Sequence, residues 1–273
     1  MTTQALPNAA QTGFSNASAY DKHRPTYTTQ ETETLLSSIG LKDHKGAKLL
    51  DLAAGTGLFT EALAARHEDF VITAIEPHDD MREELEKKDL QRVTVKKGRA
   101  NDIPLEDGSV DAVFAAQAFH WFANVESLKE IRRVLKPNGV LGLIWHVDDW
   151  NAYKSNIPTT KWEIVIKEEI WHHDDSLPRY RHGLWKAVFD EQNQVYFKSP
   201  IEEKSDPFTY YMTLEALWSR LQTFSQFANL GEEDFKKLKE RFDDALSGED
   251  VPRNEAGDVA VHGKTQYAWA KAV

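Results

Sequence analysis

Residues 48–60, with the sequence KLLDLAAGTGLFT, constrain the fold of this chain more than any other segment. A short apolar run ends in a carboxylate at Asp51, two glycines follow at Gly55 and Gly57, and an apolar-periodic stretch comes next. This order predicts a buried strand, a tight turn and a helix of an α/β unit. Glycine lets a backbone approach a ligand closely, and the N–H groups at the start of the new helix would face that ligand. The segment therefore predicts a nucleotide-type binding turn.

The residues around this turn narrow the choice of ligand. A dinucleotide-binding turn needs a third glycine where Thr60 stands, and a phosphate-binding loop would end in Gly-Lys-Ser/Thr, which is absent. Asp51 lies at the tip of the strand, where a carboxylate repels phosphate and attracts an ammonium group. The pattern predicts a ligand with a cation at this point.

A second carboxylate follows the next predicted strand. Residues 71–75 form an apolar run, and Glu76 comes directly after it, 25 positions beyond Asp51. A carboxylate at the carboxyl end of this strand can accept both hydroxyls of a ribose. An ammonium-bearing nucleoside with a free ribose describes S-adenosylmethionine (SAM).

These residues resemble the first motif of the class I SAM-dependent methyltransferases. Residues 50–57 match that motif, with Ala53 where the family more often has glycine, and Glu76 matches the ribose acid. Residues 20–27, 117–122 and 267–271 are similar to the trans-aconitate methyltransferase-like enzymes that act on small molecules, so the resemblance covers nearly the whole chain. It implies SAM as cofactor and S-adenosylhomocysteine (SAH) as product.

The resemblance also implies a set of site residues. The cofactor-binding candidates are Tyr20, Arg24, Asp51, Ala53, Gly55, Gly57, Glu76, Pro77, Met81, Ala100, Asn101 and Gln117. The substrate candidates are Tyr27, His120, Trp121, Trp145, Arg179 and Trp218, and His120 is the catalytic candidate. Relatives often carry an acid for the adenine amine where Arg99 stands here, so that contact is expected from the backbone of Ala100 or from a side chain such as Asn101 or Asp102.

Several of these candidates allow two interpretations. Residues 14–27 are either a surface arm or a lid over the SAM site, and Met81 is either plain core or an adenine contact. His120 is either a histidine packed behind aromatics or a base or clamp near the transferred methyl, because imidazole titrates near neutral pH. Trp121 is either core or an aromatic face for the sulfonium.

The remaining pattern predicts an α/β fold. Strands are expected at 93–95, 110–116 and 140–145, alternating with helices at 28–39, 58–66, 77–88 and from Asn124 to the break at 136–139. With the resemblance, this gives a doubly wound, Rossmann-like, seven-stranded sheet, mostly parallel with an antiparallel C-terminal edge, and a helical substrate cap. A sixth strand is expected at 194–203, helices at 161–172, 214–229 and 232–246, and a closing strand or strands at 259–261 and 265–272.

The expected domain organisation follows these elements. Residues 1–27 are assigned to a tail and lid, 28–147 to the SAM-binding core, 148–193 and 205–250 to helical cap insertions, and 194–204 and 258–273 to the C-terminal strands of the core.

Composition excludes several classes of function. The net charge of −11 opposes binding to DNA or RNA, and no apolar run reaches the length of a membrane span. The absence of cysteine excludes disulfides and thiolate chemistry, and His172-His173 has no third ligand at metal spacing, so no metal site is expected. We expect a cytoplasmic protein, monomeric or homodimeric, that acts on a small molecule without nucleic-acid or membrane partners.

The function predicted from the sequence is methyl transfer from SAM to a small molecule. The resemblance favours a carboxylate acceptor, which needs cationic anchors such as Arg24, Arg179 or Arg181 and no base. A hydroxyl acceptor would use His120 as a base. The alternative from another class is a regulatory protein, or a catalyst of a different reaction, that binds SAM without transferring its methyl group.

Overall fold

The computed structural model describes residues 21, 24–174, 177–192, 194–228 and 230–273. Two compact units are present. Unit 1 contains Asp21 and Arg24 with Val147–Leu177 and Pro207–Lys264, and unit 2 contains Pro25–His146, Pro178–Asp206 and Thr265–Val273. Because the units are built from different stretches of sequence, each is described by itself.

Seven strands form one sheet in the order β3-β2-β1-β4-β5-β7-β6. They are β1 (Lys48–Leu52), β2 (Val71–Ile75), β3 (Val93–Lys96), β4 (Val110–Ala116), β5 (Leu135–Asp148), β6 (Glu202–Met212) and β7 (Val259–Lys271). The first five pair in parallel, and the C-terminal strand β7 runs antiparallel. The strand order reverses at β1, which has β2 on one side and β4 on the other, and open α/β sheets bind ligands at the carboxyl ends of the strands at such a point.

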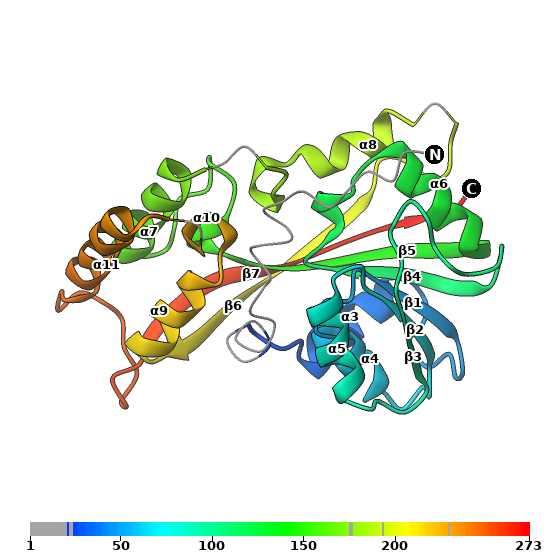
Figure 1. Cartoon of the computed structure of the whole chain (residues 1–273), viewed down its shortest axis with the longest axis horizontal. Coiled ribbons are helices and arrows are strands. Elements are labelled where there is room, and N and C mark those ends of the chain that lie inside the picture. The colour runs from blue at the N-terminus through cyan, green and yellow to red at the C-terminus, as the bar shows by residue number, and fades with distance from the viewer. Residues whose placement is uncertain (1–20, 22–23, 175–176, 193, 229) are drawn as a thin grey trace. The chain divides into compact units, whose positions relative to one another are not determined.

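The helices of unit 2 cover this sheet. In Figure 1, α3 (Thr29–Ser38), α4 (Leu58–Ala64) and α5 (Asp79–Lys87) lie together on one side of the strands, and α6 (Val125–Val134) lies on the other. Leu35 and Leu36 of α3 and Phe59 and Leu63 of α4 are buried in one core with Phe114 of β4. Burying these apolar side chains stabilises the layered arrangement by roughly 1.5–3 kcal/mol for each one.

Unit 1 has its own core. The helices α7 (Lys161–His172), α9 (Leu214–Gln222), α10 (Ser225–Ala228) and α11 (Glu232–Leu246) surround buried aromatic residues that include Trp150 and Trp162. Its charged centre is an ion pair between Arg220 and Asp148, at 2.7 Å, with both side chains almost fully buried. The Tyr210 hydroxyl donates to the other oxygen of Asp148 at 3.0 Å, so the carboxylate is held on both oxygens.

Unit 2 completes its structure with short segments outside the sheet. These are the turns η1 (Phe119–Trp121), η3 (Tyr180–His182) and η4 (Leu184–Lys186) and the helix α8 (Ala187–Asp190), while η2 (Asp149–Asn151) belongs to unit 1. None of the helices that the structure describes combines the length and the apolarity needed to cross a bilayer.

Three predicted elements differ from the structure. The strand expected at 194–203 lies at Glu202–Met212, so the expected cap insertion at 205–250 begins with strand rather than helix. The helix ends at Val134, before the break expected at 136–139, but the strand expected at 140–145 already begins at Leu135 and includes the breaker residues. The register with β4 shifts across them, from Val110 opposite Leu135 to Ala112 opposite Val140. The helix expected at 214–229 is divided into α9 and α10. The closing strand or strands expected at 259–261 and 265–272 form one continuous strand, β7.

Candidate active site

The turn after β1 depends on left-handed backbone conformations at alternate residues. Ala53, Gly55 and Gly57 have φ values of 57°, 59° and 85°. A Cβ on Gly57 would lie 2.2 Å from Cδ1 of Leu85 in α5, whereas one on Gly55 would lie 3.8 Å from Sδ of Met81. Gly57 is therefore required by helix packing as well as by its φ, and Gly55 by its φ alone. Ala53 takes the same strained conformation with a side chain, which costs about 1–2 kcal/mol.

Asp51 is completely buried at the carboxyl end of β1. Its Oδ2 accepts a hydrogen bond from the Thr60 hydroxyl at 2.6 Å, and Oδ1 is a buried oxygen without a hydrogen-bond partner among the described residues. Burial raises the pKa of this carboxyl to about 7, although the Thr60 hydrogen bond lowers it, and the nearby Glu76 raises it further. A cation placed at Oδ1 would offset this desolvation and restore the charged form.

Glu76 ties the turn to the end of β2. Its Oε2 accepts from the Gly55 N–H and its Oε1 from the His78 N–H, both at 2.8 Å. Burial raises the pKa of this carboxyl in spite of the two backbone hydrogen bonds. A carboxylate has about four acceptor positions, so each oxygen retains one for a further donor.

The other cofactor candidates lie beside these acids or on the neighbouring loop. Met81 is buried in α5 next to the Gly55 turn, and Pro77 joins β2 to that helix. Ala100 is buried and Asn101 is exposed in the turn after β3, where the Arg99 and Asp102 backbones hydrogen-bond to each other. The structure brings Met81 to the glycine turn, and it leaves the Asn101 side chain accessible.

Two successive residues of β5 hold the segment that follows β4. Trp145 Nε1 donates to His120 Nδ1 at 3.3 Å, and the His146 carbonyl accepts from Gln117 Nε2 at 3.0 Å. Gln117 has a left-handed φ of 58°, and its N–H donates to the Ile144 carbonyl. This part of the carboxyl edge is thus fixed by side chains as well as by the sheet ladder.

His120 lies in a cationic environment. Burial and the charges of Arg179, Arg181 and His182 lower its pKa to about 3, so the imidazole is neutral at physiological pH. The indole N–H is only a donor, and therefore Nδ1 of His120 must be the acceptor and Nε2 must carry the proton. His120 presents an N–H donor at its second nitrogen.

Aromatic side chains pack around the basic cluster of Arg179, Arg181 and His182 next to His120. The Arg179 guanidinium lies 4.7 Å from the Trp121 ring centroid, which accounts for one face of that indole. Trp145 packs against Tyr180 at 5.0 Å and against Trp185 at 4.7 Å. Both Arg179 and Arg181 are buried among these elements of unit 2.

The remaining candidates are divided between the two units. Tyr27 is buried between Phe59 and His146 in unit 2. Arg24 belongs to unit 1, where it donates to the Thr223 carbonyl at 3.3 Å and lies over the Phe224 ring. Trp218 also belongs to unit 1 and packs against Phe235 and Phe242 of α11. Tyr20 lies outside the described residues.

The sequence matches a known protein family. The methyltransferase domain family matches residues 50–143, from β1 through most of β5. An uncharacterized methyltransferase-like protein of Schizosaccharomyces pombe is 32% identical over 239 residues, covering 88% of this chain and 86% of that protein. The chain belongs to the class I SAM-dependent methyltransferases. The cofactor of this methyltransferase is therefore SAM.

A second yeast protein and a solved structure are also similar to this chain. An uncharacterized methyltransferase of the same yeast is 44% identical over 130 residues, 48% of this chain and 50% of that protein, so the match spans half of that relative. The structure of phosphoethanolamine N-methyltransferase 2 from Haemonchus contortus in complex with SAM has a TM-score of 0.54 and 15% identity, covering 99% of this methyltransferase and 61% of that chain. At this identity the likeness shows the fold alone.

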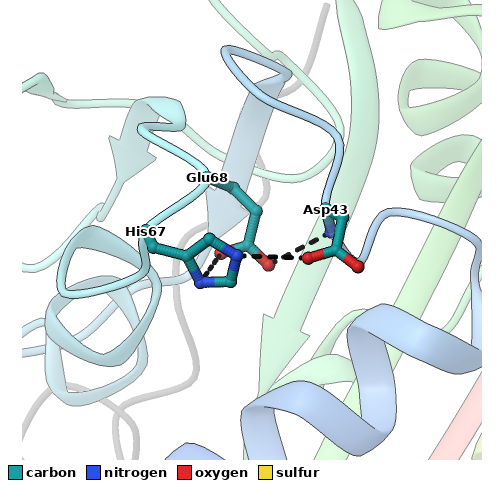
Figure 2. Close-up of side chains that lie close together, drawn as sticks. All are labelled: Asp43, His67 and Glu68. Atoms are coloured by element: carbon teal, nitrogen blue, oxygen red, sulfur yellow. Dashed lines mark hydrogen bonds and ion pairs between the residues drawn. The ribbon is translucent and has the colours of Figure 1, made fainter.

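Asp43, His67 and Glu68 form a cluster in the segments that precede β1 and β2 (Figure 2). His67 Nε2 is 3.1 Å from Asp43 Oδ1, and Nδ1 is 3.4 Å from Glu68 Oε2. Arg66 donates to both oxygens of Glu68, at 3.0 and 2.8 Å, so the buried carboxylate already has a cation. The arrangement links the loop after α3 to the segment after α4, and we assign it no metal.

A shallow cavity of about 370 Å³ lies in unit 1 between α7 and α11. Its charged lining is paired internally: Arg241 contacts Glu168 and Glu169, and Lys237 contacts Asp234. The two cations of the lining are therefore both paired with carboxylates of the same lining.

Sequence reasoning missed four residues that shape the site. Thr60 holds Asp51, Leu85 excludes a side chain at Gly57, and Glu31 bonds His146 at 2.8 Å. The Thr-x-x-Glu spacing of Thr28 and Glu31 is a capping-box signal, and it is present in the structure. No local signal predicts that Glu31 also reaches His146.

Proposed function

We propose that this methyltransferase transfers the methyl group of SAM to a carboxylate of a small molecule, with a hydroxyl group as the alternative acceptor. When bound, SAM supplies a methyl carbon activated by a positively charged sulfur, and SAH is the product. The residues of this chain would bind the two reactants, orient them in line and keep water out.

Two acids would hold the cofactor. Asp51 would face its cationic portion, because Oδ1 is a buried oxygen with no hydrogen-bond partner among the described residues. Glu76 would accept the ribose hydroxyls on the acceptor positions that Gly55 and His78 leave open. Met81, Ala100 and Asn101 would line the adenine end of the cofactor. The backbone of residues 53–57, which forms the turn, would pack against the cofactor.

The observation that carries the choice of acceptor is the hydrogen bond from Trp145 to His120. It leaves His120 with an N–H donor at Nε2, and the pKa of about 3 makes the ring a weak base. An N–H donor suits an anionic oxygen, whereas removal of a proton from a hydroxyl requires an unprotonated nitrogen.

The neighbouring charges favour the same acceptor. Arg179 and Arg181 act on His120 as cations, and both side chains are buried in unit 2. A carboxylate with a pKa near 4 is already ionised at neutral pH and attacks without losing a proton. Arginine and His120 would orient it by charge-assisted hydrogen bonds, with Trp121 and Trp145 as apolar walls.

The stability of the product to alkali tests the acceptor. The protein is incubated with methyl-labelled SAM and a metabolite extract, and the labelled product is treated with mild alkali. A methyl ester releases its label as volatile methanol, whereas a methyl ether or an N-methyl product retains it. Label retained in the non-volatile fraction would overturn the carboxylate assignment, and absence of any labelled product would favour SAM binding without transfer.

Substitution of His120 tests its role. His120→Ala should raise the KM for the acceptor by about tenfold or more, the scale of a hydrogen bond to a charged group, and leave kcat independent of pH above about pH 6. His172→Ala is the control, because this histidine is exposed on α7 of unit 1. If His120→Ala instead lowers kcat by about a hundredfold and removes a pH inflection, His120 acts as a base.

A further inference from the structure

Glu31 connects three elements of unit 2 through one carboxylate. Its Oε2 accepts from the backbone N–H and the hydroxyl of Thr28, each at 2.8 Å, which caps α3. Its Oε1 accepts from His146 Nε2 at 2.8 Å, at the end of β5, and from the Thr265 hydroxyl at 2.5 Å, in β7. All four acceptor positions of the carboxylate are therefore used.

The charge on Glu31 is stable. Burial would raise its pKa, but the hydrogen bond and charge of His146, with the bonds from Thr265 and Thr28, hold it at about 2. An ionised carboxylate can only accept, so Nε2 of His146 carries a proton and the ring orientation is fixed.

His146, held by Glu31, contacts two candidate site residues. Its ring stacks on Tyr27 with a centroid separation of 4.6 Å and an interplanar angle of 27°. Its carbonyl accepts from the side chain of Gln117, whose left-handed backbone needs support from its surroundings. Gln117 begins the turn that carries His120.

We propose that Glu31 and His146 are positioning residues for the active site, which set Tyr27 and the segment from Gln117 to His120 for binding of SAM and the acceptor. The inference rests on the proposed placement of both ligands at this edge of the sheet. Glu31 and His146 touch neither ligand. They act through the stacked Tyr27 ring and through the hydrogen bond between Gln117 and the His146 carbonyl.

Two pairs of variants separate positioning from stability. Glu31→Gln removes the charge that orients His146, and His146→Leu removes the donor and the ring. His146→Gln keeps an N–H donor for Glu31 and is the conservative rescue. Thr28→Ala is the matched control, because it removes the hydroxyl that donates to Oε2 of the same carboxylate, keeps the backbone N–H that also donates there, and leaves the contact of Oε1 with His146 in place.

The measurements are the SAM dissociation constant by calorimetry, kcat and KM for SAM, and Tm. We expect Glu31→Gln and His146→Leu to weaken SAM binding and lower kcat/KM by about tenfold or more, since small misplacements in a site are costly to rate. His146→Gln should recover most of this loss, and Thr28→Ala should lower Tm without changing SAM affinity.

The outcomes distinguish this inference from the proposed function. If the variants bind SAM as the unaltered protein does, or if Thr28→Ala loses as much affinity as Glu31→Gln at an equal Tm, the pair is only structural. If replacement of Asp51 or Glu76 alone, with Glu31 and His146 intact, costs no SAM affinity, the proposed placement of the cofactor site is wrong instead.

Discussion

Asp51 joins two properties that rarely occur together in one carboxyl group. It has no exposed surface, and one of its oxygens has no hydrogen-bond partner among the described residues. Desolvation therefore outweighs the Thr60 hydrogen bond, and the pKa is raised to about 7. For the folded protein without ligand, this group contributes stability that is fully present below its ordinary pKa of 3.8 and is lost as pH rises through about 7.

SAM binding should be linked to release of a proton from Asp51. A cation beside Oδ1 favours the ionised form, so SAM affinity should rise with pH between about pH 5.5 and 7, by up to about tenfold per unit. Calorimetry in buffers of different ionisation enthalpy measures the released proton directly. Asp51→Asn should abolish this dependence, and a proton release that persists in Asp51→Asn would assign the linkage to another group such as Glu76.

The turn after β1 contains one residue whose conformation opposes its type. Ala53 has a left-handed φ, where the resembling family more often carries glycine. Ala53→Gly would remove roughly 1–2 kcal/mol of strain and add roughly 0.4–1 kcal/mol of unfolded-state entropy cost. We therefore expect a gain in the free energy of unfolding of up to about 1.5 kcal/mol, measured by urea denaturation.

Ala54→Gly is the matched control for this prediction. Ala54 is the next residue and is not among the residues with positive φ, so glycine there should only destabilise. Equal effects of the two changes would show that the backbone strain at Ala53 is not what limits the stability of this turn.

The central elements were predictable because they are buried. β1, β2 and β4 are largely apolar, as central parallel strands usually are, and the observed bounds of β2 and β4 match the predicted ones. The helix at 232–246 was predicted to the residue as a solvated, charge-laced helix, and the structure shows that its buried residues are Leu238, Phe242 and Leu246.

β6 was misplaced for a physical reason. It is the last strand of the sheet order, its residues are exposed or half-buried, and it contains Pro207. An edge strand tolerates charge and proline, so it lacks the apolar run that marks a central strand. The start of β5 was predicted too late for a different reason. The breaker residues at 136–139 lie inside the strand, where its register with β4 shifts.

The acids of the site were predictable, and their partners were not. Strand ends place Asp51 and Glu76 on neighbouring strands, so their proximity follows from the parallel pairing of β1 and β2. The contacts of His120 with Trp145 and of His146 with Glu31 join residues 25 and 115 positions apart. Such pairs depend on tertiary packing, which no local pattern encodes.

At the scale of the whole molecule, the candidates around the glycine turn all belong to unit 2. Asp51, Glu76 and Met81 lie there, whereas α7 and α11 form part of the core of unit 1. Addition of SAM should slow amide hydrogen exchange at 53–57 and at the start of α5, and leave α7 and α11 unchanged. Equal protection of α7 would contradict this assignment, and protection at Thr223 would bring Arg24 into the SAM site.

The basic cluster around His120 has a kinetic consequence for a chain with a net charge of −11. A small anion approaching from solution meets repulsion at long range and attraction only over the last few ångströms. Moderate salt screens the long-range repulsion more than the short-range attraction, because the Debye length is about 8 Å at physiological ionic strength and buried charges are screened less. Added salt should therefore speed the arrival of an anionic acceptor while slowing that of the cationic cofactor.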